Sequence, residues 1–330
     1  MSEEFVKKAS LILEKLKGQL SQSMVLDKWL IDQILISILN QGHVLLEAAP
    51  GLGKTTLVKV LARLMSLDHQ RVQCTPDLMP SDITGMNVYN PESKLFELHK
   101  GPVFTQLLLV DEINRTSPRT QSALLQAMAE SEVSLDRETH KLDPQFWVLA
   151  TQNPMEFSGT YPLPEAQLDR FFIKIGFEYP SANQMKAIAA MNLQGAPEQA
   201  VRPLINPKTL SQLQALIHKI HVDDGVLQYA ADICDAVNQH PDIRIGVSPR
   251  GCVALVKAAR AYALLQERAF VTPDDVVIMT TPVLAHRLTT VRDMSLDKAF
   301  FQHVALSVSA PHVGQDHQST ESNNSKLALV

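Results

Sequence analysis

The stretch HVLLEAAPGLGKTTLVKVLARLM, residues 43–65, decides the fold. It begins with an apolar run typical of a short buried strand, and its second half, KTTLVKVLARLM, has helical spacing. The loop between them fits the pattern GxxxxGKS/T except at its first position, where Ala48 replaces glycine. A strand, a glycine-rich loop and a helix in this order predict a loop whose backbone N–H groups bind phosphate. A chance glycine-rich turn is the alternative, and the flanking elements argue against it.

Several residues of the predicted phosphate loop have an expected role in nucleotide binding. Gly51 and Gly53 allow the backbone to pass close to the phosphates, and Lys54 is expected to reach the β- and γ-phosphates. The hydroxyl of Thr55 is expected to bind Mg²⁺. Ala48 is compatible with the loop if its φ is negative, because alanine adds only a methyl group. The residues expected to contact the nucleotide in this loop are Ala49, Pro50, Gly51, Leu52, Gly53, Lys54, Thr55 and Thr56.

Four further apolar runs predict strands of the same sheet: RVQC from 71, LLLVD from 107, FWVLATQ from 146 and FFIKI from 171. Each is short and bounded by turn residues, as in parallel sheets that are covered on both faces. Helical patterns precede the first strand at 5–20 and 26–39, the second ending at Gly42, and another begins at residue 118. Strands that alternate with helices predict a doubly wound α/β domain with a parallel sheet.

Beyond about residue 180 the strand pattern gives way to helices. The helical patterns cover 207–219, 223–238, 249–266 and 273–287, and residues 192–206 have the composition of a linker. Ser248-Pro249 and Thr272-Pro273 each place a hydroxyl N-cap before a proline at N1. We therefore expect an αβα domain over 1–192 and a smaller α-helical domain over 193–306. The polar composition of 307–330 predicts a disordered tail.

An apolar strand that ends in two acids, LLLVDE at 107–112, supplies a second element of the predicted site. Asp111 is expected to hold Mg²⁺, and Glu112 to orient and polarise the attacking water. Acids at strand ends are common by themselves. The motif gains its meaning from its place after a phosphate loop.

Three polar residues complete the predicted site. Asn153, at the end of a later strand, is expected beside the attacking water, with the capping of a turn as its alternative role. Arg170 is expected to stabilise charge on the γ-phosphate of a neighbouring subunit, with a salt bridge to Asp169 or Glu165 as the alternative. Arg250 lies in the first turn of a helix in the second domain, from which it could reach the nucleotide of its own subunit.

Composition and charge exclude several classes of protein. The 330 residues, 45% of them hydrophobic, are enough for a large α/β domain and a smaller one. The formal net charge is −5 without a basic tract, which disfavours nucleic-acid binding. The three cysteines, Cys74, Cys234 and Cys252, lack zinc-site spacing and favour a reducing compartment. Without a signal-peptide pattern or a membrane-length apolar run, we expect a cytoplasmic protein.

On these motifs the chain resembles the MoxR family of AAA+ ATPases over about residues 25–290. The most specific stretches are LLLVDEINRTSPRTQSALLQAMAE and VLATQNPMEFSGTYPLPEAQLDRFF, supported by CTPDLMPSDITG and SPRG. The resemblance implies an AAA+ αβα sandwich followed by an α-helical lid. It also implies a helix-2 insert at about 78–104 and a hairpin, VSLDRETHKLD, before the sensor strand.

The resemblance also implies an activity, which is hydrolysis of ATP to ADP and phosphate with Mg²⁺. In the family pattern Glu112, Lys54, Asn153 and Arg170 are catalytic, Thr55 and Asp111 hold the metal, and Arg250 is a second sensor of the nucleotide. Asn114 and Arg115 belong to the signature DEINR and are expected to face the neighbouring subunit or the γ-phosphate. An arginine that acts on a neighbour implies a ring, expected to be a hexamer. The family commonly remodels, matures or activates client proteins together with a von Willebrand factor A domain partner.

The chain departs from the family pattern at two places. One is Ala48, and the other is Val25-Leu26-Asp27, where relatives often carry a VGQ-like segment beside the adenine. Both concern nucleotide affinity and base choice rather than catalysis.

Three other functions are open at this stage. A chelatase-type AAA+ subunit for metal insertion also uses a von Willebrand factor A partner. A nucleic-acid motor is disfavoured by the acidic balance and by the mixed charges of VSLDRETHKLD. A nucleotide-gated scaffold would not need hydrolysis for its client activity.

Overall fold

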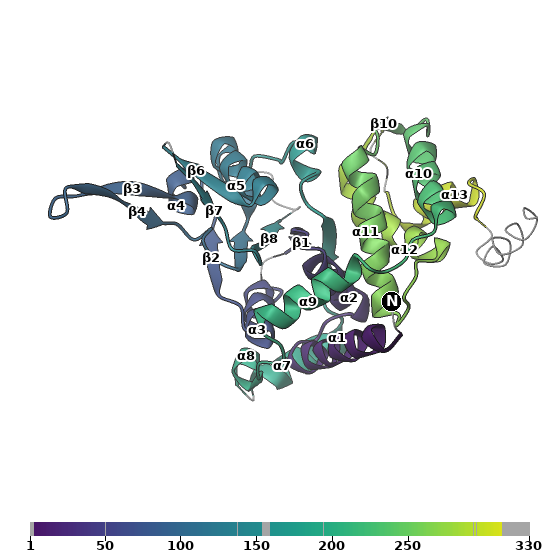
Figure 1. Ribbon diagram of the computed structural model, residues 1–330, viewed down its shortest axis with the longest axis horizontal. Helices are drawn as coiled ribbons and strands as arrows, with labels where there is room; N and C mark the ends of the chain where they lie inside the picture. Colours follow the sequence, from purple (N-terminus) through teal and green to yellow (C-terminus); the bar gives the residue numbers. More distant parts are fainter. Residues whose placement is uncertain are drawn as a thin grey trace, which may run out of the picture.

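The computed structural model describes residues 3–49, 51–136, 138–153, 159–193, 195–292, 294 and 296–311. A central sheet lies between a projecting hairpin on one side and a group of helices on the other (Figure 1). Among the described residues, no helix is both long and apolar enough to cross a membrane.

The central sheet has five parallel strands in the order β2-β5-β8-β1-β9. They are β1 (Val44–Ala48), β2 (His69–Gln73), β5 (Leu107–Asp111), β8 (Trp147–Gln152) and β9 (Ile173–Phe177). The five predicted strands are therefore confirmed as one sheet. Because the strands are parallel, their carboxyl ends meet at one edge, where α/β proteins bind ligands.

Helices cover both faces of the sheet, as predicted for an αβα sandwich. They include α1 (Glu3–Ser23), α2 (Lys28–Leu39), α3 (Lys54–Met65) and α5 (Pro118–Glu130). Successive strand residues point to opposite faces. Accordingly, Leu107 and Leu109 share a hydrophobic cluster with α1–α3, whereas Leu108 and Val110 share a second cluster with α5.

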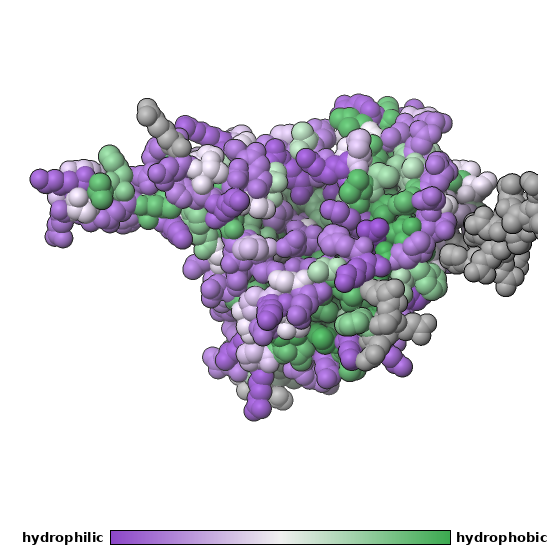
Figure 2. Space-filling model, viewed as in Figure 1, coloured by the Kyte–Doolittle hydropathy of each residue, from purple (hydrophilic) through white to green (hydrophobic). Residues whose placement is uncertain are grey.

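Two β-hairpins lie outside the central sheet, both at the positions where they are expected. The predicted insert contains α4 (Pro80–Thr84), β3 (Gly85–Asn90) and β4 (Leu95–Lys100). The predicted hairpin before the sensor strand is β6 (Glu132–Leu135) and β7 (Glu138–Lys141). The β3–β4 hairpin projects away from the sheet (Figure 1), and Figure 2 shows apolar side chains on it, where Leu95 and Phe96 are exposed.

The rest of the chain is mostly helical. Its helices are α6 (Glu165–Leu168), α7 (Ala182–Leu193), α8 (Pro197–Ala200), α9 (Pro207–Ile217), α10 (Asp224–Asn238), α11 (Pro249–Leu265), α12 (Pro273–Leu284) and α13 (Lys298–Leu306). A ribbon of β10 (Ile243–Ile245) and β11 (Thr289–Thr290) and the 3-10 turns η1 (Ile113–Arg115) and η2 (Ala285–Arg287) complete the fold.

The predicted starts of two C-terminal helices are confirmed. The Ser248 hydroxyl accepts a hydrogen bond from the N–H of Gly251 in the first turn of α11. At α12, the carboxylate of Asp275 accepts from the N–H of Thr272. One hydrophobic cluster runs from the sheet through α1 and α2 to α11, α12 and α13, so the helical part shares its core with one face of the sandwich.

Three expectations about segment ends need correction or lie outside the description. The linker predicted at 192–206 contains the end of α7 and all of α8. The helix before β1 ends at Leu39, and the left-handed residue after it is Gln41, with φ of 52°. Gly42 is required for a different reason, since a Cβ there would lie 2.3 Å from Cγ of Phe172. The predicted tail lies outside the described residues beyond residue 311.

Candidate nucleotide site

The phosphate loop leaves β1 at Ala48 and enters α3 at Lys54. Gly51 and Gly53 have φ of 83° and 84°, a left-handed conformation that glycine adopts without steric cost. Gly53 is the N-cap of α3 and offers no side-chain cap, so the first N–H groups of the helix remain available to a ligand. Such groups bind anions at helix N-termini. Pro50 of the predicted loop lies outside the described residues.

Ala48 does not need to be glycine. It is the last residue of β1 and pairs with Phe177 of β9, so its backbone is extended. Its carbonyl oxygen accepts a hydrogen bond from Nζ of Lys54 at 3.3 Å. The lysine is thereby folded over the loop that it is predicted to serve, and the departure from the glycine pattern leaves the loop's shape intact.

Asp111 and Glu112 follow one another at the carboxyl end of β5, where Thr151 of β8 links them. The Thr151 hydroxyl donates to Oδ1 of Asp111 at 3.3 Å and accepts from the N–H of Glu112 at 2.9 Å. Glu112 has φ of 58° and ψ of 52°. This left-handed conformation costs a non-glycine residue on the order of 1–3 kcal/mol, and such strain is concentrated at functional sites.

Two partners of these acids were not predicted from the sequence. Nε of Arg71 donates to Oδ2 of Asp111 at 2.7 Å, and Nε2 of Gln73 donates to Oε2 of Glu112 at 3.0 Å. Both residues lie on β2, two positions apart, and β2 pairs with β5 so that Gln73 stands beside Asp111. Their alternation is visible in the sequence. Their contact with the acids depends on the pairing of β2 with β5, which cannot be read from the sequence.

The carboxylates make this edge of the sheet electronegative. Burial, and then the negative charges of Asp111 and Glu112, raise the pKa of the Cys74 thiol to about 12. Asp111 itself is buried, with 5% of its surface exposed. A partly desolvated carboxylate at a ligand-binding edge suits a hard divalent cation such as Mg²⁺.

The remaining predicted residues at this edge lie close to the acids. Asn153 directly follows β8, the strand that separates β5 from β1 in the sheet, and so lies between the acids and the phosphate loop. Nε of Arg115 lies 3.0 Å from Oε2 of Glu112. Asn114 is buried, and its carbonyl oxygen accepts from the N–H of Tyr161 at 2.6 Å. Arg115 therefore contacts the acid predicted to activate water.

A pocket of about 890 Å³ opens beside the phosphate loop. Gly51, Gly53 and Thr56 line one part of it. The segment Val25-Leu26-Asp27, which departs from the family pattern, lines another part of the pocket. Met24, which directly follows α1, and apolar side chains of β9 and α7 add to the wall, among them Phe177, Met185 and Ile188. A largely apolar pocket of this size that ends at an anion-binding loop fits a nucleotide.

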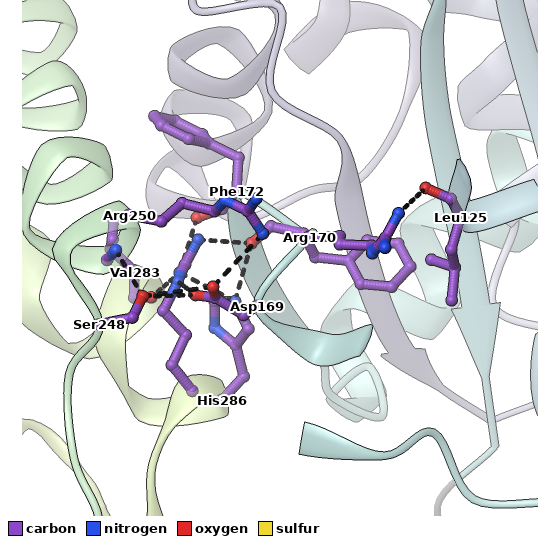
Figure 3. Close-up of polar contacts among 11 residues, drawn as sticks. Leu125, Asp169, Arg170, Phe172, Ser248, Arg250, Val283 and His286 are labelled. Carbon is purple, nitrogen blue, oxygen red and sulfur yellow. Dashed lines mark hydrogen bonds and ion pairs between the residues drawn. The ribbon is translucent and has the colours of Figure 1, made fainter. Parts of the chain in front are cut away.

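Arg170 and Arg250 lie in a second cluster. Arg170 donates to the carbonyl oxygen of Leu125 in α5 at 2.7 Å. Arg250, at the start of α11, pairs with Asp169 at 3.5 Å, and Arg287 of η2 pairs with the same carboxylate at 2.9 Å. Figure 3 shows Asp169 between the lid residues Ser248 and Arg250 on one side and Arg170 on the other.

The strand register separates this cluster from the phosphate loop of the same chain. In the parallel pair of β1 and β9, Val44 stands beside Ile173 and Ala48 beside Phe177. The phosphate loop follows Ala48 at the carboxyl edge, whereas Arg170 precedes Ile173 at the amino edge. Five residues of strand span about 16 Å, and an arginine side chain reaches roughly 7 Å by standard bond lengths. Arg250, which was expected to reach the nucleotide of its own subunit, pairs here with Asp169 next to the amino edge.

Comparison with known proteins gives the same picture. Residues 43–173 match the model of the ATPase family associated with various cellular activities, and residues 235–305 match the AAA lid domain. YeaC of Bacillus subtilis is 46% identical over 254 residues, which are 77% of this chain and 79% of that protein. The chaperone MoxR1 of Mycobacterium tuberculosis is 36% identical over 295 residues, with 87% of this chain and 78% of that protein covered.

The fold of nearly the whole chain is similar to that of a solved structure. The crystal structure of a proposed ATPase from Cytophaga hutchinsonii superimposes with a TM-score of 0.85 and 33% identity, over 94% of this chain and 98% of that one. The parallel sheet, the glycine loop, the paired acids and the helical lid agree with these matches. The chain therefore belongs to the MoxR family of AAA+ ATPases.

Proposed function

We propose that this chain hydrolyses ATP to ADP and phosphate at a site shared between two subunits of a ring. Gly51, Gly53 and the first N–H groups of α3 offer donors to a triphosphate, and Lys54 lies over the same loop. The adjacent pocket of about 890 Å³ has the size and the apolar walls that a nucleoside needs.

The polar groups at the carboxyl edge support hydrolysis with Mg²⁺. Thr55, in the first turn of α3, and Asp111 would hold the ion, which neutralises charge on the phosphate oxygens when it is bound. Glu112 would polarise the attacking water, with Asn153 as a second contact. Gln73 and Arg115 both contact Oε2 of Glu112, so they would orient its carboxylate toward the water.

The single observation that carries the shared site is the separation of arginines and phosphate loop across the sheet. Arg170 and Arg250 lie at the amino edge, next to one another through Asp169, and the nucleotide groups lie at the carboxyl edge. A second copy of the chain would be needed to bring one of these arginines to the γ-phosphate. Repetition of such a head-to-tail contact closes a ring, for which we propose a hexamer.

We further propose that the ring remodels, matures or activates a client protein together with a von Willebrand factor A domain partner. Family membership supports this role, and one relative is named a chaperone. The β3–β4 hairpin supports it as well, because it projects from the sheet and exposes apolar residues such as Leu95 and Phe96. Exposed apolar patches mark sites of protein contact.

The shared site is tested by Arg170→Ala and Glu112→Gln, alone and mixed. Each variant alone should bind ATP and lose turnover, by about 10³-fold or more for the arginine. In a mixture, the intact Glu112 of one subunit meets the intact Arg170 of the other, so phosphate release should rise well above the sum of the separate variants. Arg119→Ala, an exposed arginine at the start of α5, is the matched control and should keep wild-type turnover.

Two outcomes would contradict the proposal. One is Arg170→Ala protein with wild-type turnover, and the other is a mixture that releases no more phosphate than its components. The client role is tested separately, by capture of bound proteins on the Glu112→Gln variant loaded with ATP. Recovery of neither a client nor a von Willebrand factor A domain protein, compared with the Lys54→Ala variant, would oppose it.

A further inference from the structure

We propose that Asp169 is a positioning residue that joins the lid to the arginine segment, so that Arg170 and Arg250 are presented together to the neighbouring subunit. The inference rests on the proposed shared site and adds a residue to it. Asp169 would not touch the nucleotide. It would act through the arginines on either side of it.

Three side chains of the helical part converge on the Asp169 carboxylate. Nε of Arg287 donates to Oδ1 at 2.9 Å, and the Ser248 hydroxyl lies 3.2 Å from both carboxylate oxygens. Arg250 contacts Oδ2 at 3.5 Å. Ser248 is also the N-cap of α11, so the carboxylate engages the start of the helix that carries Arg250 (Figure 3).

The two arginines bind Asp169 in different ways. The Arg287 side chain is 3% exposed, whereas the Arg250 side chain is 62% exposed. Burial lowers the pKa of Arg287 to about 10, against the opposing effect of Asp169, so Arg287 is still charged at neutral pH. A buried charge needs a paired counter-charge, whereas an exposed pair is weak. Arg287 is therefore a permanent partner of Asp169, and Arg250 can leave it for a phosphate.

Arg287 holds the backbone on both sides of Arg170. Before Arg170 it binds the side chain of Asp169, and after Arg170 its Nη2 donates to the carbonyl oxygen of Phe171 at 2.7 Å. Nε2 of His286 donates to the same carbonyl oxygen at 3.0 Å. The lid thus fixes the backbone of residues 169–171, while α5 receives the Arg170 side chain at Leu125.

This arrangement gives the Asp169 charge a specific consequence. Without it, the buried Arg287 lacks its counter-charge, and the backbone beside Arg170 is held only through the carbonyl oxygens of Phe171 and Phe172. Arg250 also loses the group that keeps it on the same side as Arg170. The loss would concern the arginine face that a subunit offers to its neighbour. The phosphate loop and Glu112 of the same subunit lie at the other edge of the sheet and would be preserved.

The test is Asp169→Asn, which removes the charge and keeps the shape. We expect kcat to fall at least about tenfold, with KM for ATP within about threefold of wild type, the pattern of a group that acts in the transition state. Mixing Asp169→Asn with Glu112→Gln should restore turnover above the sum of the two, because Glu112→Gln subunits supply intact arginines. A structural defect of the whole subunit would not be restored.

A matched control lies elsewhere in the lid. Asp275 pairs with Arg268 at 2.5 Å and is 2% exposed, so Asp275→Asn removes a comparable carboxylate from an arginine that does not adjoin Arg170. This variant should show no loss that Glu112→Gln subunits can restore. If Asp169→Asn fails to fold, Asp169→Glu keeps the charge and displaces the carboxylate. Its kcat should fall at least about threefold and be restored by the same mixing.

The outcomes separate this inference from the proposed function. Asp169 variants with wild-type kcat, or folded variants that Glu112→Gln subunits do not restore, would overturn the positioning role while Arg170→Ala still behaves as a shared-site variant. If Arg170→Ala itself keeps full turnover, the shared site fails first, and the inference fails with it.

Discussion

The two edges of the sheet differ in the functional groups that lie there and in the contacts that hold these groups in place. The carboxyl edge carries the glycine loop and the acids Asp111 and Glu112, held by bonds between neighbouring strand ends such as those of Thr151. The amino edge carries Arg170 and Arg250, held by the helical lid through Asp169 and Arg287. The nucleotide groups are thus fixed by the sheet itself, and the arginines are fixed by a second layer of structure.

This difference suggests how the subunits of a ring would communicate. A change in the position of the lid would reach Arg170 and Arg250 through Asp169 and Arg287, whereas the phosphate loop lies at the other edge of the sheet. Variants at the carboxyl edge should therefore change binding or chemistry at the subunit's own site. Variants at the amino edge should change chemistry at a neighbour's site.

The largest effect is expected from Lys54→Ala at the carboxyl edge. Hydrogen bonds to charged groups contribute about 1.5–3 kcal/mol each, so the loss of contacts to two phosphates should weaken ATP binding at least about 100-fold. Titration calorimetry with Mg·ATP measures this change. Lys59→Ala is the matched control on the same helix, since Lys59 pairs with Glu198 on the surface. Unchanged affinity in Lys54→Ala would refute the phosphate loop.

The next effect concerns the amino edge and pH. His43 is buried next to Phe172, and burial lowers its pKa to about 4. Its Nδ1 accepts from the N–H of Val148 at 3.0 Å, so Nε2 donates to the carbonyl oxygen of Met128, and protonation would break the first bond. The folded chain stays neutral at His43 while the unfolded chain binds a proton below about pH 6.5, so stability falls as pH drops from about 6.5 to 4. The full shift corresponds to about 3 kcal/mol.

Denaturant unfolding of wild type and His43→Gln across this pH range measures the effect. As pH drops, the free energy of unfolding of the wild type should fall more steeply than that of the variant. The difference in slope should correspond to the uptake of at most one proton on unfolding. His303→Gln, at an exposed site on α13, should follow the wild type. Parallel curves for wild type and His43→Gln would contradict the lowered pKa of His43 in the folded chain.

A smaller effect is expected from Thr151→Val, which keeps the shape of the side chain and removes its hydroxyl. The N–H of Glu112 and Oδ1 of Asp111 both lose a partner, and an unsatisfied buried group costs about 1–3 kcal/mol, so turnover should fall about tenfold. Single-turnover phosphate release measures it. The control is Thr280→Val, a buried threonine within α12. Full turnover in Thr151→Val would show that the two acids need no link through β8.

The smallest effect is expected from Ala48→Gly, which restores the family pattern. Because Ala48 is extended and at the end of β1, glycine relieves no strain there. Turnover and ATP affinity should change by less than about tenfold, or about 1.4 kcal/mol. A larger gain, measured in the same assays, would mean that the methyl group restrains the loop.

Much of the fold was predictable because each strand of the sheet is a short apolar run with turn residues at its ends. The order of the strands and the residues they bring together were less accessible. Arg71 and Gln73 look like ordinary surface residues of a strand until β2 is placed beside β5. Arg287 follows a proline-containing helix with no motif around it, and Asp169 gives no sign in the sequence that it serves the lid rather than Arg170.

The sequence by itself determined the chemistry of the predicted site, since a glycine loop, a lysine, two acids and an arginine are local features that short motifs specify. Only the tertiary structure decided which of these groups share an edge. The reason is that parallel strands place residues that are distant in sequence side by side, while the two ends of each strand lie at opposite edges of the sheet. The positions of Arg170 and Arg250 relative to Gly51 are therefore set by the strand register and by the lid.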